Sequence, residues 1–163
     1  MIGQKELYDI LLKLEISYEY HEHPPLHTIE DARTHWKDYN SARCKNIFFR
    51  NHKGNRHYLV IIDHRAELDI HNLEKRLKQG KLTFASEQRI HKLLGLRPGS
   101  LSPFGLINDK EKHVHLFIDS HLKEAKLISF HPNINTASLV LSFDNLMKFL
   151  NFQKNHFEFI EFY

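Results

Sequence analysis

Two neighbouring segments decide the fold: Lys45-Asn-Ile-Phe-Phe-Arg50 and His57-Tyr-Leu-Val-Ile-Ile-Asp63. Both are rich in β-branched and aromatic residues, which favour strands. The loop between them contains Gly54, which can adopt the positive φ that a hairpin turn requires. The apolar run Tyr58–Ile62 has no polar break, so it predicts a central strand that is covered on both faces of a sheet.

The rest of the chain mixes helices and strands without the strict alternation of a parallel sheet. Apolar residues spaced three and four apart predict a first helix, with Leu7, Ile10, Leu11 and Leu14 on its buried face. Residues suited to cap helices begin four later ones: Thr28, Asp69, Ser86 and Ser142. Further strands are expected at 16–23, 113–118, 127–130, 138–142 and 157–162, and a structured loop rich in glycine and proline at 95–109. We expect a single α+β domain over residues 1–163, with a mixed, mostly antiparallel sheet flanked by helices.

Composition bounds the class of protein. The chain has 163 residues, of which 41% are hydrophobic, enough to bury one continuous core. No apolar run approaches the roughly 20 residues of a membrane helix, so no membrane partner is expected. The first residues contain no apolar leader, which favours a cytoplasmic location. The net charge of +3 permits nucleic-acid binding without requiring it.

Metal and thiol chemistry are not favoured. The single cysteine, Cys44, can form neither an internal disulfide nor a cysteine-based zinc cluster. It also has no assignable histidine partner for nucleophilic catalysis. The pairs His21/His23 and His113/His115 have metal-ligand spacing, but no further ligand is apparent for either pair. We therefore expect no metal and no other cofactor.

Three segments are candidates for chemistry. Lys45 lies at the end of an apolar strand face with Ile47 and Phe49, while Asn46 faces the other way. Partial desolvation would strengthen its interaction with a carbonyl or phosphate oxygen; alternatively it is a strand-end lysine that reaches into water. The loop 95–109 could present backbone N–H groups to a ligand or could be a plain connection. Polar residues in 130–137 could line a cleft or could make turn hydrogen bonds.

Taken together, four segments resemble the YbaK/ProX family of aminoacyl-tRNA deacylases. They are Arg43-Cys-Lys-Asn-Ile-Phe-Phe-Arg50, Lys81-Leu-Thr-Phe-Ala-Ser-Glu87, the loop from Leu94 to Asp109, and Phe130-His-Pro-Asn-Ile-Asn-Thr-Ala137. The segments occur in the family's order and span most of the chain. The resemblance implies hydrolysis of the ester that joins a wrong amino acid, alanine in this subfamily, to tRNA for proline. It also implies a curved central sheet.

The resemblance also assigns site residues. Lys45 matches the family's functional lysine, which would stabilise charge on the carbonyl oxygen or anchor the terminal ribose and phosphate. The substrate-binding residues that it implies are Asn46, Gly99, Ser100, Pro103, His131, Asn135 and Thr136. The resemblance further implies that a ribose hydroxyl of the tRNA helps to activate water, so that no protein base is required. The stiff Gly99–Pro103 loop would wall a pocket that holds alanine and excludes proline.

The expected partner is the aminoacylated acceptor end of tRNA, with prolyl-tRNA synthetase left open as a second. Lys81 and Arg97 are the candidate tRNA-binding residues, because they flank the matching segments. The alternatives are a deacylase for Cys-tRNA(Pro) or another aminoacyl-tRNA, and a non-catalytic module that binds aminoacyl-tRNA or a synthetase.

Overall fold

The central hairpin has the predicted form. The computed structural model describes residues 1–26, 28–36 and 41–162. Strands β2 (Ala42–Arg50) and β3 (His57–Asp63) pair antiparallel, with Lys45 opposite Ile62. β3 lies between β2 and β5 (His115–Asp119), and all its residues except the last are buried. Alternate β3 side chains enter two separate hydrophobic clusters, so the prediction of a strand covered on both faces is confirmed.

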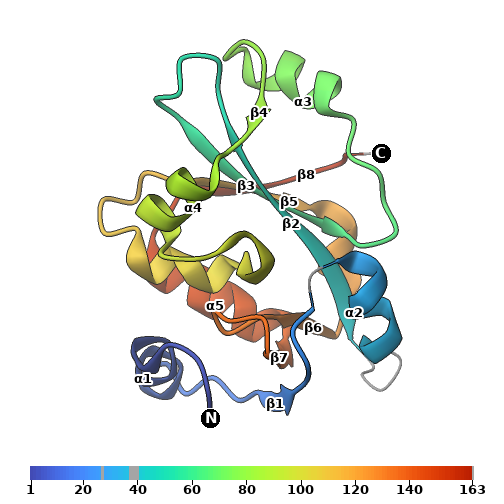
Figure 1. The fold of residues 1–163 in the computed structure, drawn as a ribbon, viewed down its shortest axis with the longest axis vertical. Coiled ribbons are helices and arrows are strands. Elements are labelled where there is room, and N and C mark those ends of the chain that lie inside the picture. Colours follow the sequence, from blue (N-terminus) through green and yellow to red (C-terminus); the bar gives the residue numbers. More distant parts are fainter. Residues whose placement is uncertain (27, 37–40, 163) are drawn as a thin grey trace.

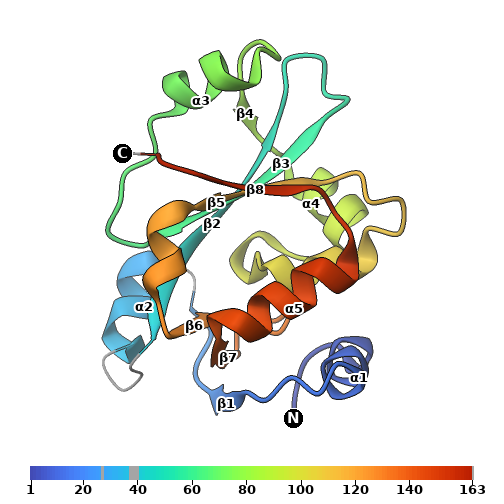
Figure 2. The same cartoon turned by 180° about the vertical axis from the view of Figure 1, so that it is seen from behind.

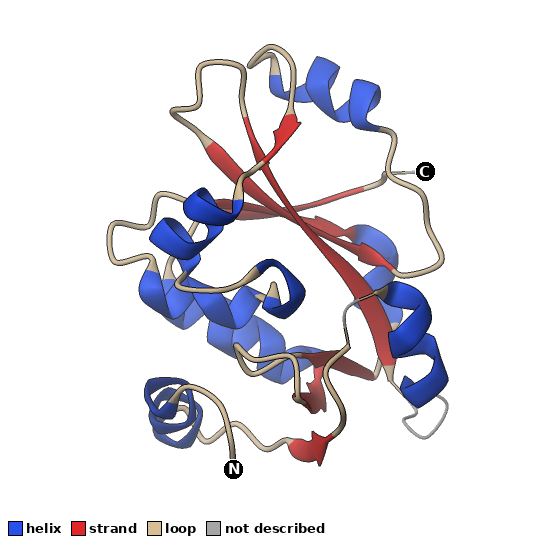
Figure 3. Ribbon diagram, viewed as in Figure 1, coloured by secondary structure: helices blue, strands red, loops and turns tan. Residues whose placement is uncertain are grey.

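The strands form one mixed sheet in the order β1-β7-β6-β2-β3-β5-β8, with β4 paired to β2 (Figure 3). The remaining strands are β1 (Glu19–Glu22), β4 (Thr83–Phe84), β6 (Leu127–Phe130), β7 (Ala137–Ser142) and β8 (Phe157–Ile160). Within the described residues four pairings are antiparallel and three, β2–β6, β3–β5 and β5–β8, are parallel. The mixed α+β prediction is confirmed, although parallel pairing is more extensive than the sequence indicated.

Helices cover both faces of the sheet. They are α1 (Lys5–Lys13), α2 (Ile29–Trp36), α3 (Ile70–Leu77), α4 (Glu87–Leu94) and α5 (Phe143–Gln153), with short 3-10 helices η1 (Pro98–Ser100), η2 (Pro103–Asn108) and η3 (Ser120–Glu124). Buried residues of α1, α4 and α5 share one hydrophobic cluster, whereas α3 joins the other. Figure 1 shows α3 and α1 at opposite ends of the molecule, and the reverse view in Figure 2 shows α5 and β8 in front. Every helix in the described part of the chain falls short of the length and apolar character of a membrane span.

The predicted helix caps are confirmed. The side-chain oxygens of Thr28, Asp69, Ser86 and Ser142 each accept a hydrogen bond from the backbone N–H three residues later. These bonds satisfy N–H groups that the first helical turn leaves without partners. Local chemistry therefore fixes where four of the helices begin.

Several strand boundaries differ from the prediction: β2 begins at Ala42 and not at residue 45, and β8 ends at Ile160 and not at residue 162. Local hydrogen bonds explain two further differences. β1 begins at Glu19 and not at residue 16, because the Ile16 N–H bonds back to Leu11 O at the end of α1. β5 begins at His115 and not at residue 113, because the preceding N–H groups, those of His113 and Val114, donate to the Asp109 carboxylate. In both places a local hydrogen bond removes a residue from the ladder.

One edge of β2 is paired at both ends and open between them. On the side away from β3, β6 pairs with Ala42 and Arg43, and β4 pairs with Phe49 and Arg50. The Ala85 N–H also donates to Phe48 O. In the described part of the chain no strand lies opposite residues 44–47 on this side. Along β2, the pairing with β6 ends at Arg43 and the pairing with β4 begins at Phe49, so the open stretch lies between them.

Candidate functional site

A cavity of about 290 Å³ lies against the open edge of β2. Its lining comes from the segment before α2, from β2, from η1 and its flank, and from the facing ends of β6 and β7. The lining residues are Leu26, Thr28, Cys44, Lys45, Asn46, Ile47, Pro98, Gly99, Leu101, Ser129, Phe130, His131 and Ser138. Three of the four segments that carried the family resemblance therefore meet at one place.

The cavity touches the main chain of β2. Four consecutive residues, 44–47, line it, although successive side chains of a strand point to opposite faces. Cys44 packs in one hydrophobic cluster, whereas Ile47 packs against the other. A single cavity can contact all four residues because it lies at the strand's edge, where backbone atoms are exposed.

The half-buried Lys45 side chain is held by the protein. Its Nζ donates a hydrogen bond of 2.8 Å to the carbonyl oxygen of Ala66, in the loop after β3. This contact argues against a lysine that merely reaches into water. An ammonium group carries three donors, so two remain for a ligand.

His131 lines the cavity as a neutral imidazole. Its Nδ1 lies 2.8 Å from Ala137 O, and a carbonyl oxygen can only accept, so Nδ1 carries the hydrogen. Burial lowers the pKa of His131, and the nearby His23 lowers it further, while the bond to Ala137 acts in the opposite direction. The Nε2 atom then carries a lone pair.

Asn46 and Gly99 both line the cavity. The Asn46 Oδ1 atom is buried and has no hydrogen-bond partner in the described part of the chain. A Cβ placed on Gly99 would lie 3.5 Å from Asn135 Nδ2, so the Gly99 loop and the 130–137 segment lie within contact distance of each other.

Asn135 and Thr136 do not line the cavity. Their carbonyl oxygens accept from Leu26 N and His23 N, so they hold the wall that Leu26 forms.

Ser100 and Pro103 belong to the loop that contributes Pro98, Gly99 and Leu101 to the cavity lining. Both are buried and neither lines the cavity. The Ser100 N–H donates to Arg97 O, and Pro103 is the first residue of η2. Both residues therefore help to fix the backbone conformation of the loop.

Four lining residues lie outside the segments that carried the family resemblance: Leu26, Thr28, Ser129 and Ser138. The Ser138 Oγ lies 2.8 Å from His23 Nε2, which ties β7 to the segment before α2. The pairing of β1 with β7 helps to bring these segments together, and no local sequence pattern specifies that pairing. Cys44 also lines the cavity, but burial raises the pKa of its thiol well above the ordinary value, which opposes a nucleophilic role.

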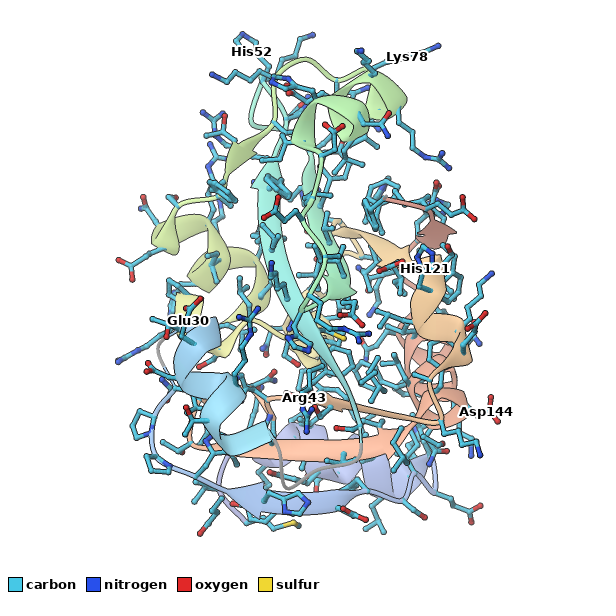
Figure 4. The ribbon with its side chains drawn as sticks, turned by 90° about the vertical axis from the view of Figure 1, so that its right-hand side faces the viewer. Glu30, Arg43, His52, Lys78, His121 and Asp144 are labelled. Atoms are coloured by element: carbon cyan, nitrogen blue, oxygen red, sulfur yellow. The ribbon has the colours of Figure 1, made fainter. Side chains whose placement is uncertain are left out.

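The two candidate tRNA-binding residues are exposed but lie at different places. Arg97 directly precedes the cavity-lining Pro98. Lys81 lies two residues before β4, which pairs with Arg50, about 17 Å along β2 from Lys45. In Figure 4 the nearby His52 and Lys78 lie at the far end of the molecule from Arg43.

Among the described residues no three His, Cys, Asp or Glu side chains converge to hold a metal ion.

Comparison with known proteins identifies the family. Residues 23–149 match the model of the aminoacyl-tRNA editing domain. The chain is 38% identical over 149 residues to the prolyl-tRNA editing protein ProX of Acetoanaerobium sticklandii, covering 91% of each chain. It is 31% identical to prolyl-tRNA synthetase associated domain-containing protein 1 of Mus musculus, covering 89% of this chain and 88% of that one.

Solved structures show the same fold. The hypothetical protein APE2540 superposes with a TM-score of 0.72 at 15% identity, covering 94% of this chain and 97% of the other. A candidate trans-editing enzyme for prolyl tRNA synthetase superposes with a TM-score of 0.71 at 16% identity, covering 98% of both. The matched region contains every residue that lines the cavity. The resemblance and the prediction of an aminoacyl-tRNA deacylase are confirmed: the chain belongs to the aminoacyl-tRNA editing domain family.

Proposed function

We propose that residues 1–163 act as one deacylase domain that removes alanine from mischarged tRNA(Pro) in trans. The observation that carries this proposal is the cavity of about 290 Å³ at which Lys45, Gly99 and His131 meet. It lies just below the volume range of drug-sized ligand pockets and suits a small acyl group. The names of the similar proteins, a prolyl-tRNA editing protein among them, support tRNA(Pro) as the carrier.

The reaction is hydrolysis of an activated ester. A water oxygen forms a bond to the carbonyl carbon, negative charge develops on the carbonyl oxygen, and the bond to the ribose oxygen breaks as that oxygen takes a proton. None of the lining residues in the described part of the chain carries a carboxylate. This supports a mechanism in which a ribose hydroxyl of the tRNA helps to activate the water, while the protein positions the ester and stabilises the developing charge.

Of the two roles open to Lys45, the geometry favours an anchor for the terminal ribose and phosphate. Its ammonium is held by Ala66 O, and Ala66 does not line the cavity. A phosphate at the cavity mouth could use the two remaining ammonium donors. Lys45 then fixes the tRNA end, so that the ester lies against β2.

Size would separate alanine from proline. In this proposal the walls formed by Leu26, Gly99 and Leu101 fit the methyl group of alanine and exclude the pyrrolidine ring of proline. A single hydrophobic pocket that accepts proline cannot strongly reject the smaller alanine. An editing pocket that accepts alanine and excludes proline would therefore correct this error by size. Asn46 and His131 supply polar contacts in the cavity, and Asn135, Thr136, Ser100 and Pro103 support its walls.

We propose that Arg97 contacts the tRNA backbone near the cavity and that Lys81 contacts it farther along β2. Both side chains are exposed and cationic, as phosphate contacts require. A prolyl-tRNA synthetase that delivers the substrate remains a second proposed partner, supported by the names of the animal relatives.

Deacylation assays on purified protein test the proposal. Ala-tRNA(Pro) should lose its amino acid far faster than Pro-tRNA(Pro). Equal rates would contradict size exclusion, and faster loss from Cys-tRNA(Pro) would favour the cysteine alternative. Protein that binds Ala-tRNA(Pro) without hydrolysing it would favour the binding module.

Lys45→Ala should lower kcat/KM for Ala-tRNA(Pro) at least about 100-fold, because a phosphate anchor of the reacting end is lost. Lys148→Ala is the matched control: this lysine also donates to a carbonyl, Leu14 O, but on α5 and away from the cavity lining. Circular dichroism should show both variants folded. Near-normal turnover by Lys45→Ala would remove Lys45 from the mechanism.

A further inference from the structure

The main-chain N–H and C=O groups of β2 alternate in direction, and two hydrogen bonds at the ends of the hairpin show which of them point toward β3. His64 N donates to Arg43 O at 2.8 Å, and Asn51 N donates to Arg56 O at 3.1 Å. In an antiparallel ladder, every second residue exchanges both hydrogen bonds with its partner. The continuous register with β3 therefore turns the N–H and C=O groups of residues 45, 47 and 49 toward β3, and those of residues 44, 46 and 48 away from it.

The groups that turn away meet different surroundings. The Phe48 carbonyl accepts from Ala85 N, which independently supports the assigned phase. Cys44 directly follows the residues that pair with β6. Asn46 lies between these two regions, beside the cavity. In the described part of the chain its main-chain N–H and C=O have no protein partner. Groups of this kind normally bind water or a ligand.

We propose that the aminoacyl group binds opposite Asn46 as one added residue of an antiparallel sheet. The α-ammonium of the substrate donates to the Asn46 carbonyl oxygen, and the Asn46 N–H donates to the ester carbonyl oxygen. An amino acid carries the same donor and acceptor as a strand residue, so the two can exchange both bonds of a hydrogen-bonded pair. This inference rests on the proposed deacylase function and specifies how that site reads its substrate.

The composition of the cavity supports this arrangement. The substrate brings a positive α-ammonium, yet none of the lining residues in the described part of the chain is Asp or Glu. In this proposal neutral acceptors hold the ammonium, and the open β2 edge supplies one on the main chain. The buried Asn46 Oδ1, which has no partner among the described residues, is a second acceptor on the same residue.

The register also fixes the direction of the bound group. β4 runs antiparallel to β2, with Phe84 opposite Phe49 and Ala85 bonded to Phe48. The chain then turns into α4 at its N-cap, Ser86. The substrate occupies the position that β4 would fill if it continued past Phe48. In this position the Asn46 N–H points at the oxygen on which charge develops, as an oxyanion donor must.

Substrate analogues test the ammonium contact without altering the fold. Propionyl-tRNA(Pro) keeps the ester and the small acyl group but lacks the α-ammonium. Each kcat/KM is divided by the uncatalysed hydrolysis rate, because the ammonium also activates the ester chemically. The corrected value should be at least about tenfold lower for propionyl-tRNA(Pro) than for Ala-tRNA(Pro). Equal corrected values would overturn the inference.

The Asn46→Ala variant distinguishes recognition of the ammonium by the Asn46 main chain from recognition by the Asn46 side chain. It retains the N–H and C=O groups, so the corrected preference for alanyl over propionyl esters should persist even if its overall rate falls. Loss of the preference in this variant would assign ammonium recognition to the Asn46 side chain and would overturn the main-chain proposal.

Nuclear magnetic resonance tests the N–H contact independently of turnover. The probe is 3′-alanylamido-3′-deoxyadenosine, whose amide resists hydrolysis and keeps both the ammonium and the carbonyl oxygen. Saturation should slow hydrogen exchange of the Asn46 amide and shift its resonance, with the ladder-bonded Ile47 amide as control. If Ala-tRNA(Pro) is hydrolysed but the Asn46 amide does not respond, the inference fails and the proposed function stands. If no ester is hydrolysed but the amide responds, the proposed function fails and the binding mode stands.

Discussion

At the scale of single residues, two glycines of the same predicted loop have different constraints. A Cβ on the buried Gly105 would lie 2.6 Å from Leu96 Cδ1, closer than two carbon atoms can pack. A Cβ on Gly99 would meet Asn135 Nδ2 at 3.5 Å, an ordinary contact. Gly105 is therefore required by packing, whereas Gly99 is free to vary as far as packing is concerned and borders the cavity.

The substitution Gly99→Ala should therefore lower mainly the activity, whereas Gly105→Ala should lower mainly the stability. Gly99→Ala should change the free energy of unfolding by less than about 1 kcal/mol, yet lower kcat/KM for Ala-tRNA(Pro) at least about tenfold, because its methyl narrows the cavity. Gly105→Ala should cost about 1–3 kcal/mol through overpacking. Urea unfolding and deacylation assays measure both. Undiminished activity in folded Gly99→Ala would show that Gly99 does not limit the cavity.

Sequence periodicity predicts which way each β2 side chain points but not what lies beside the strand. The two-residue repeat places Lys45 with Ile47 and sets Asn46 on the other face, which agrees with the hydrophobic clusters. The open edge opposite Asn46 depends on β4 and β6, which follow β2 by more than 30 and 70 residues in the chain. Local residue patterns do not encode such distant pairing.

At the scale of elements, Asp109 organises the turn between η2 and β5. Its buried carboxylate accepts hydrogen bonds from His113 N at 3.2 Å, from Val114 N at 2.8 Å and from Asn155 Nδ2 at 2.8 Å. One side chain therefore joins the turn to the segment between α5 and β8.

Asp109→Ala should destabilise the protein by about 3 kcal/mol or more, because it leaves buried donors without an acceptor. Asp144→Ala, which alters an exposed carboxylate in the first turn of α5, should cost less than about 1 kcal/mol. Chemical denaturation of the two variants gives the comparison. A similar small loss in both would mean that water replaces the Asp109 carboxylate.

The elements differ in how well the sequence specifies them. Helix starts at Thr28, Asp69, Ser86 and Ser142 are predictable because a cap is a contact between residues three apart. β4 is not predictable in the same way: it has only two residues, and its pairing with β2 is what makes it a strand. The parallel pairing of β2 with β6 is equally non-local.

At the scale of the whole molecule, a chain of side chains links β3, α4 and the turn before β5. Arg89 Nη1 lies 3.0 Å from His57 Nε2, and His57 Nδ1 lies 2.8 Å from His113 Nε2. Arginine can only donate, so His57 accepts at Nε2 and donates from Nδ1. Burial, together with His113, Arg89 and Arg50, lowers the pKa of His57 to about 4, against a smaller opposing effect of Asp109.

Stability should therefore fall as the pH is lowered. With an ordinary pKa of 6.5 in the unfolded chain and about 4 in the folded one, His57 binds a proton more readily when unfolded. Its contribution is complete above pH 6.5 and is lost on descending to pH 4, by up to about 3 kcal/mol. Thermal or urea unfolding across this range measures the loss. His57→Gln should flatten this part of the profile, and an unchanged profile would place the titration elsewhere.

Binding of tRNA should depend strongly on salt if it relies on phosphate contacts. Replacing Lys81 or Arg97 by Ala should reduce the slope of log affinity against log salt by about 1 each, since each removes one ion pair with the backbone. Filter binding of uncharged tRNA(Pro) over a salt series measures the slopes, with Lys148→Ala as control. Unaltered slopes would exclude these two side chains from the interface.

An unsatisfied sheet margin usually recruits strands from foreign chains and seeds aggregates. Here β6 and β4 close the margin of β2 from both directions, so a lone amino acid fits where an extended polypeptide does not. A growing nascent chain is attached through the α-nitrogen, and in the proposed orientation it would collide with the backbone around Ala85. The same two strands that prevent association would thereby spare peptidyl-tRNA during translation.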